Sequence, residues 1–177
     1  MKIQERAHRV GTTARTQALT GKTNGIRTRR LPNGVIGNVG LFYVCYQLSR
    51  MGWNVMPTAR NAKGVDLIAY SDDASRVLSL QVKALSKRAP VPLGTGLDQF
   101  FASYVVVCRH VLTDTPECFV LTPGEVRRLA HRGEKDGRVS YWLQPREYEA
   151  KSFHEAWGRI GFGYADSDMP DALTPGN

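Results

Sequence analysis

The sequence has few of the residues that build disulfide frameworks or zinc sites. Only three cysteines occur among 177 residues, and Cys45, Cys108 and Cys118 lie inside apolar segments at unrelated spacings. This pattern predicts buried thiols, because disulfide-stapled secreted proteins carry dense, paired cysteines. We therefore expect a reducing, cytoplasmic location. The four histidines show no ligand spacing to one another or to cysteine, which argues against zinc.

Long apolar runs are also missing. No stretch approaches the roughly 18 apolar residues that a membrane helix needs, and the basic N-terminus has no apolar core of a signal peptide. We therefore expect no membrane partner. A hydrophobic content of 42% and a charged content of 23% are ordinary for a globular protein. The length allows one domain, with spare residues for arms.

Acidic residues are nearly absent from the first segment. Residues 1–34 carry eight Lys or Arg residues against one acid, Glu5, and so hold +7 of the net charge of +8. A basic arm on a near-neutral domain is typical of a protein that binds nucleic acid. We expect DNA as the partner, and RNA stays an alternative because charge does not distinguish the two polymers. The other alternative is a tail that only aids solubility. The arm residues expected to contact phosphate are Arg15, Lys22, Arg27, Arg29 and Arg30.

Apolar patterns and turn residues predict a single α/β domain with a mixed sheet. We expect a basic, flexible arm over 1–34, the domain over 35–160 and a frayed tail over 161–177. A Pro/Gly-rich loop is expected near residues 86–96. Capping boxes at Thr122 and Ser152 predict two helices, reaching about residues 133 and 160. A further helix is expected over 37–51, and strands over 53–57, 65–71, 76–85, 103–110, 117–122 and 138–144.

One carboxylate and one ammonium lie inside two neighbouring strands that are otherwise apolar. Side chains alternate between the faces of a strand, so Gln81 and Lys83 point the same way. If the turn at residues 72–75 joins the two strands into a hairpin, Asp66 lies level with them. We expect a carboxylate, an amide oxygen and an ammonium to converge on one face.

Such a trio has a chemical use. Mg²⁺ prefers oxygen ligands and keeps several waters, so Asp66 and Gln81 are candidate ligands. The metal activates water and stabilises charge on a phosphoryl oxygen, and Lys83 can orient or deprotonate the attacking water. A buried ion pair between Asp66 and Lys83 is the alternative, and these residues alone leave both interpretations open.

Residues 37–83 resemble the PD-(D/E)xK nuclease superfamily, in particular its Holliday-junction-resolvase-like and small endonuclease branches. The resemblance implies a restriction-endonuclease-like core, in which helices flank a central mixed sheet. It also implies hydrolysis of DNA phosphodiester bonds with Mg²⁺ or Mn²⁺, with metal held by Asp66 and Gln81 and water positioned by Lys83. Small nucleases of this kind often act as homodimers. The residues that match in order and spacing are Gly37, Gly40, Leu48, Gly52, Asp66, Gln81 and Lys83.

The sequence departs from this resemblance in the first helix. The family is expected to have Glu where this chain has Leu41, and more commonly an acid where it has Gln81. Asp66 is then the only negative charge of the trio, so we expect weaker metal binding. Two functions stay open: a Mg²⁺-dependent DNA endonuclease whose arm, Lys87 and Arg88 hold the phosphate backbone, and an inactive nuclease-fold module that binds DNA or a protein partner.

Overall fold

A computed structural model describes residues 31–59 and 64–164 of the chain. The described residues belong to a unit that begins at Leu31. Most of the predicted C-terminal tail lies outside the described residues, and so does every arm residue expected to contact phosphate, namely Arg15, Lys22, Arg27, Arg29 and Arg30.

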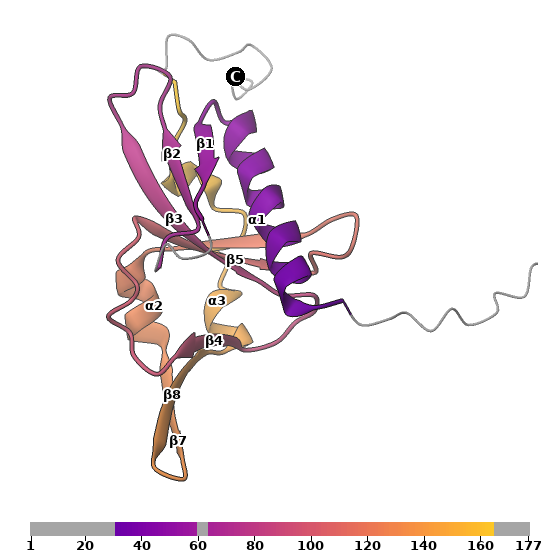
Figure 1. Cartoon of the computed structure of the whole chain (residues 1–177), viewed down its shortest axis with the longest axis vertical. Helices are drawn as coiled ribbons and strands as arrows, with labels where there is room; N and C mark the ends of the chain where they lie inside the picture. Colours follow the sequence, from indigo (N-terminus) through magenta and orange to yellow (C-terminus); the bar gives the residue numbers. More distant parts are fainter. Residues whose placement is uncertain (1–30, 60–63, 165–177) are drawn as a thin grey trace, which may run out of the picture. The chain divides into compact units, whose positions relative to one another are not determined.

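A mixed five-stranded sheet forms the centre of this unit (Figure 1). Strands β3 and β5 run parallel, and the other neighbouring pairs are antiparallel. The β-branched residues of β5, with the sequence YVVVCR, suit a strand that is covered on both faces. In the order β1-β2-β3-β5-β6, the strands span Asn54–Pro57, Leu67–Tyr70, Val77–Ala84, Tyr104–Arg109 and Glu117–Leu121.

Helix α1 (Asn33–Arg50) covers one face of the sheet (Figure 1). Its Leu48 is fully buried and belongs to the same apolar core as Leu80 of β3. A Cβ atom at Gly40 would lie 2.5 Å from the Cβ of Ala84, so only glycine lets the helix approach β3 this closely. Neither α1 nor another helix within residues 31–59 and 64–164 is long and apolar enough to cross a membrane.

The opposite face of the five-stranded sheet carries a second, smaller sheet and two short helices. The small sheet is antiparallel, in the order β4-β8-β7. These elements are β4 (Val91–Gly94), α2 (Pro123–Leu129), β7 (His131–Lys135), β8 (Arg138–Leu143) and α3 (Pro145–Tyr148). A short 3₁₀ helix, η1 (Trp157–Arg159), lies near the end of the described residues, and its Trp157 packs against the core on the α1 side.

Two apolar cores lie on the two sides of the five-stranded sheet. Leu80 and Val106 face α1, whereas Val105 and Val107 belong to the core shared with β4, β8, α2 and α3. Because side chains alternate along β3, the residues on either side of Val82 point away from α1 and toward the second core. All three cysteines are free thiols and, as predicted, buried.

The capping box at Thr122 starts a helix as predicted, but this helix is shorter than expected. The Thr122 hydroxyl accepts from the Glu125 N–H, and the Glu125 carboxylate accepts from the Thr122 N–H. Helix α2 ends at Leu129, and the residues expected to continue it to Gly133 form β7. Asp136–Gly137, both with positive φ, form a tight turn that returns the chain and pairs β7 with β8.

The prediction of a helix from the capping box at Ser152 is wrong. The chain forms a turn there, and only the 3₁₀ helix η1 follows. Glu155, expected to complete the box, instead accepts from the N–H of Cys118, 2.6 Å away. The carbonyl of Phe153 accepts from the N–H of Val120. Strand β6 lies at the edge of its sheet, so its open backbone groups bind this segment and prevent a helix.

Two segments expected to be irregular are more ordered than the sequence suggests. The predicted Pro/Gly loop contains β4, which pairs with β8. The beginning of the predicted tail is held by backbone hydrogen bonds: the N–H of Gly163 donates to Met51, and its carbonyl accepts from Asp72. Short strands and backbone contacts of this kind leave no periodic apolar pattern, so sequence analysis missed them.

Candidate functional site

Asp66 stands at the point where β2 begins. Its N–H donates to the carbonyl of Leu80, at 2.8 Å. Its side chain reaches β3, where the Val82 N–H donates to Asp66 Oδ2 with 2.7 Å between nitrogen and oxygen. The carboxylate therefore satisfies a backbone donor of β3 beyond the end of the β2 ladder. Among the described residues, the side-chain hydrogen bond of Asp66 is made by Oδ2 and not by the other carboxylate oxygen, Oδ1.

Gln81 is a buried polar residue of β3 that faces the second core. Its side chain is only 7% exposed. The register that pairs Leu67 with Leu80 places Asp66 level with Gln81, on the same face of the sheet. No donor in the described part of the chain reaches the buried oxygen Gln81 Oε1. A buried amide oxygen without a partner costs about 1–3 kcal/mol, so its presence calls for a ligand or another explanation.

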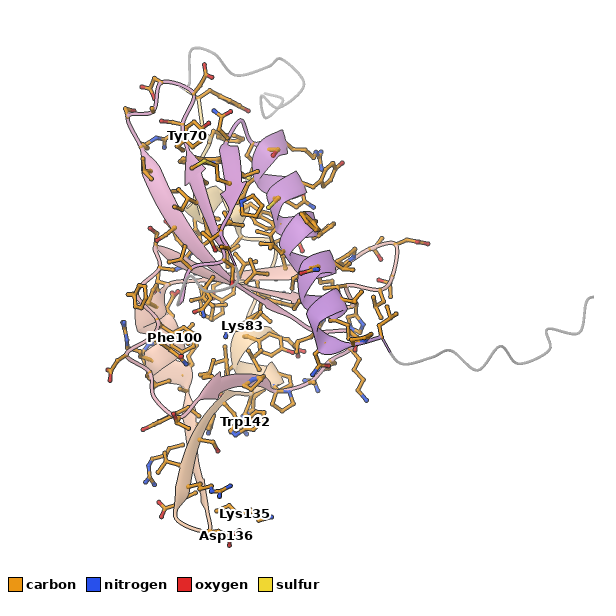
Figure 2. All side chains as sticks on the ribbon, in the orientation of Figure 1. Tyr70, Lys83, Phe100, Lys135, Asp136 and Trp142 are labelled. Atoms are coloured by element: carbon orange, nitrogen blue, oxygen red, sulfur yellow. The ribbon has the colours of Figure 1, made fainter. Side chains whose placement is uncertain are left out.

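Lys83 follows two residues later on the same face. Its ammonium nitrogen lies 5.6 Å from the centre of the Phe100 ring, and Figure 2 labels both residues. Phe100 is fully buried in the second core. Burial lowers the pKa of the Lys83 ammonium below its ordinary value, and the negative charge of Asp66 offsets part of that change. The site thus contains an amine that loses its proton more readily than an exposed lysine does.

The structure brings the three predicted residues together, but not as an ion pair. Asp66 and Lys83 do not approach within the 4.0 Å of a salt bridge, and the carboxylate binds the backbone of β3 instead. This arrangement contradicts the alternative of a buried Asp66–Lys83 salt bridge. The carboxylate oxygen, the amide oxygen and the ammonium remain as three separate polar groups on one face of the hairpin.

The oxygen atoms of this site fit a hard divalent cation. Mg²⁺ takes oxygen ligands and keeps several waters, so the unpartnered Gln81 Oε1 and the open Oδ1 of Asp66 are suitable donors. Among residues 31–59 and 64–164, no group of three or more His, Cys, Asp and Glu side chains is placed to hold a metal. Waters and substrate phosphate oxygens would therefore have to supply most of the ligands.

The two cations predicted after β3 differ in their surroundings. Lys87 is exposed in the loop that follows β3. Arg88 makes a two-pronged ion pair with Glu149, with 2.7 Å from Nε to Oε1 and 2.8 Å from Nη2 to Oε2. Glu149 also binds Arg109. The guanidinium of Arg88 is thus engaged within the protein, whereas the ammonium of Lys87 is directed to solvent.

Two groups at the site were missed by sequence analysis. Phe100, next to Lys83, lies in the irregular segment between β4 and β5, where no periodic pattern marks it. The Val82 N–H orients Asp66, but almost every residue carries a backbone N–H, and this one is available only because β2 begins after Asp66. Aligning the two strands of the hairpin from the turn at residues 71–76 back past the first residue of β2 would have suggested the contact between Asp66 and Val82.

Comparison with solved structures shows the type of fold. The chain is similar to the bacterial homing endonuclease I-Ssp6803I, with 17% identity, 73% of this chain and 93% of that chain covered, and a TM-score of 0.50. The Holliday junction resolvase Hjc of Archaeoglobus fulgidus also matches, with 17% identity, 64% and 87% coverage and a TM-score of 0.45. No protein-family model and no curated protein matches the chain. The similarity to I-Ssp6803I confirms the predicted restriction-endonuclease-like core at the level of the fold.

Proposed function

We propose that this chain, which has the restriction-endonuclease-like fold of PD-(D/E)xK nucleases, is a Mg²⁺-dependent endonuclease that hydrolyses phosphodiester bonds of DNA. The observation that carries the proposal is the unpartnered, buried Gln81 Oε1 on the same face as Asp66 and Lys83. Oxygen donors next to an ammonium are what phosphodiester hydrolysis requires of a protein site. The named activities of the similar structures, a homing endonuclease and a Holliday junction resolvase, agree with this chemistry.

Each residue of the trio has a distinct task. Asp66, oriented by the Val82 N–H, supplies a negatively charged oxygen as a metal ligand, and Gln81 supplies a neutral one. When bound there, Mg²⁺ or Mn²⁺ would lower the pKa of a coordinated water and neutralise charge on a phosphate oxygen. The backbone bond to Asp66 fixes the direction of its carboxylate before any substrate arrives.

Lys83 is proposed to act on the attacking water. Its lowered pKa increases the fraction of neutral amine near neutral pH, which can accept a hydrogen bond and a proton from water. The water oxygen attacks phosphorus, the bond from phosphorus to the leaving oxygen breaks, and that oxygen takes up a proton from solvent water. In its charged form, the same side chain stabilises negative charge on the phosphoryl group.

A cleavage assay tests the proposal. The full chain is incubated with plasmid, linear and branched DNA, with Mg²⁺ or Mn²⁺ and with a chelator. We expect metal-dependent cleavage of at least one substrate, and a loss of at least about 100-fold in Lys83→Met, which keeps the length of the side chain without its nitrogen. Metal-dependent cleavage that Lys83→Met performs at the full rate would place the chemistry elsewhere.

A second function has its own supporting observation. Asp66 is the only acid of the trio, and the helix position expected to carry Glu holds Leu41. An inactive nuclease-fold module that binds DNA or a protein partner would keep the fold without needing more ligands. Such a module would bind duplex DNA or protein without cutting any of the three substrates with either metal.

The basic arm is proposed to hold the phosphate backbone of DNA, together with Lys87. Residues 1–34 carry +7 of the net charge of +8. Phosphate contacts of this type are independent of sequence and sensitive to salt. A cytoplasmic location, action on RNA and a homodimer stay predictions of the sequence.

Deletion of residues 1–30, which removes all eight cations of the arm and leaves α1 whole, should weaken DNA binding and flatten its salt dependence. For every phosphate that the truncated protein no longer neutralises, the slope of log K against log salt should fall by about 0.9, because fewer counterions are released. Fluorescence anisotropy over a salt series measures both quantities, with circular dichroism as the control for folding. An unchanged slope after truncation would show that the arm does not touch phosphate.

A further inference from the structure

The β7–β8 hairpin projects away from the five-stranded sheet (Figure 1). Its base is anchored by Leu143, which is fully buried in the second core together with Phe100, the neighbour of Lys83. Its far end is the turn at Asp136–Gly137. In Figure 2, Lys135 and Asp136 mark this far end and Trp142 lies nearer the base. The hairpin is therefore a two-stranded ribbon that extends from the side of the protein that carries the candidate site.

The two faces of this ribbon differ in charge. Directly paired residues share a face, and the register pairs Arg132 with Tyr141 and Glu134 with Val139. On this first face, Arg132 and Glu134 form an ion pair of 2.7 Å, so their charges cancel. The second face, here called the cationic face, comprises the pairs His131 with Trp142, Gly133 with Ser140, and Lys135 with Arg138.

The end of the cationic face carries two like charges directly opposite each other. Lys135 and Arg138 are exposed cross-strand partners, and neither has an ion-pair partner among the residues that the structure describes. Like charges in this position destabilise a sheet by roughly 0.2–1 kcal/mol. Of the two acids next to Lys135 in sequence, Glu134 lies on the other face, paired with Arg132, and Asp136 is one of the two turn residues. A stability cost at an exposed tip indicates that the two cations serve an external anion.

We propose that the cationic face of the β7–β8 ribbon enters the major groove of duplex DNA, with Lys135 and Arg138 on the flanking phosphates. This inference rests on the proposed DNA-directed function and names a second contact surface for it. The major groove of B-DNA admits a two-stranded ribbon. The small pair of Gly133 and Ser140 leaves the middle of the face free of bulky side chains, so the backbone can approach the bases.

The length of the ribbon sets how far from its base this contact occurs. Five steps along β8 separate Arg138 from Leu143, which at about 3.3 Å per residue amounts to roughly 17 Å. DNA rises about 3.4 Å per base pair, so this length equals about five base pairs. A ribbon of this length would contact double-stranded DNA beyond the bond that is cut.

Charge-neutral variants on the two faces test the inference. Binding is measured by anisotropy over a salt series, in full-length protein carrying Asp66→Asn so that no DNA is cut. We expect Lys135→Gln/Arg138→Gln to lower affinity for B-form duplex DNA about tenfold and to reduce the salt slope by about 1.8. The control Arg132→Gln/Arg50→Gln removes the same charge from the other ribbon face and from α1, and should change both quantities far less.

The melting temperature distinguishes a loss of DNA contacts from a loss of folding. Removing the two opposed cations should leave the melting temperature unchanged or raise it, while DNA binding weakens. Equal reductions of affinity in the two double variants, or a reduction confined to single strands or to duplex RNA, would overturn the inference. Cleavage is measured separately, in the protein that keeps Asp66. If that protein cuts DNA while binding is indifferent to Lys135 and Arg138, the inference is overturned and the nuclease proposal stays intact. If binding depends on these two residues and the protein that keeps Asp66 cuts no DNA, the inference is supported and only the nuclease proposal is weakened.

Discussion

Replacing Asp66 with Asn should abolish DNA cleavage and leave the fold nearly as stable as before. The amide oxygen of Asn can still accept the Val82 N–H, which Asp66 Oδ2 accepts at 2.7 Å. The negative charge, which is the only one in the trio, is removed. Mg²⁺ binds carboxylates far better than amides, so the site should lose its metal and its activity together.

The contrast with Asp66→Ala separates the two roles of this residue. Alanine removes both the charge and the acceptor, so the Val82 N–H is left without its partner. We expect Asp66→Ala to lower the free energy of unfolding by about 1–3 kcal/mol, and Asp66→Asn by less. Cleavage assays with Mg²⁺ and denaturant melts on the two variants measure both effects. Full cleavage by either variant would remove Asp66 from the active site.

Replacing Leu41 with Glu should lower stability without raising the affinity for Mg²⁺. Leu41 is half-buried on α1 next to Gly40, which lies over Ala84 at the end of β3. At 100° per residue, Leu41 lies about 160° around the helix from Tyr43. Tyr43 donates to the carbonyl of Pro116, on the β6 side. Leu41 therefore points away from β6, and it packs against the apolar core on the α1 face of the sheet, whereas Gln81 and Lys83 point to the other face.

A carboxylate there would lie on the α1 face of the sheet, away from the candidate metal ligands on the other face. We expect unchanged Mg²⁺ affinity, with a decrease of about 1–2 kcal/mol in stability because a half-buried apolar side chain is replaced. Leu41→Gln is the matched control, since it has the same shape as Glu without the charge. Calorimetric titration of Mg²⁺ and melting curves on the three proteins give the answer. Tighter Mg²⁺ binding by Leu41→Glu than by Leu41→Gln would show instead that this position reaches the metal site.

The central sheet could be predicted because its strands carry a strong local signal. The apolar run of β5 and the hairpin of β2 and β3 stand out from their turns, and alternation alone places Gln81 and Lys83 on one face. The position of the turn at residues 72–75 then placed Asp66 level with these two residues. These inferences needed only the period of a strand and the position of one turn.

The second sheet could not be predicted in the same way. Strand β4 is four residues long and contains a proline, so it looks like part of a loop until β8 pairs with it. The capping box at Ser152 is a local signal that a tertiary contact overrides, because Glu155 binds the edge of β6 instead. The Asp136–Gly137 pair was a missed signal, since this dipeptide favours the tight turn of a hairpin.

The connection between β3 and β5 has a consequence for the order of folding. The bond from Val82 to Asp66 spans 16 residues and closes within a local hairpin, which forms in about 1–10 μs in isolated peptides. The parallel pairing of β3 with β5 must wait for the crossover that includes β4, because distant contacts are slower to form. We therefore expect the negative charge of the site to be oriented early, and the ammonium of Lys83 to acquire its lowered pKa only when Phe100 and β5 arrive.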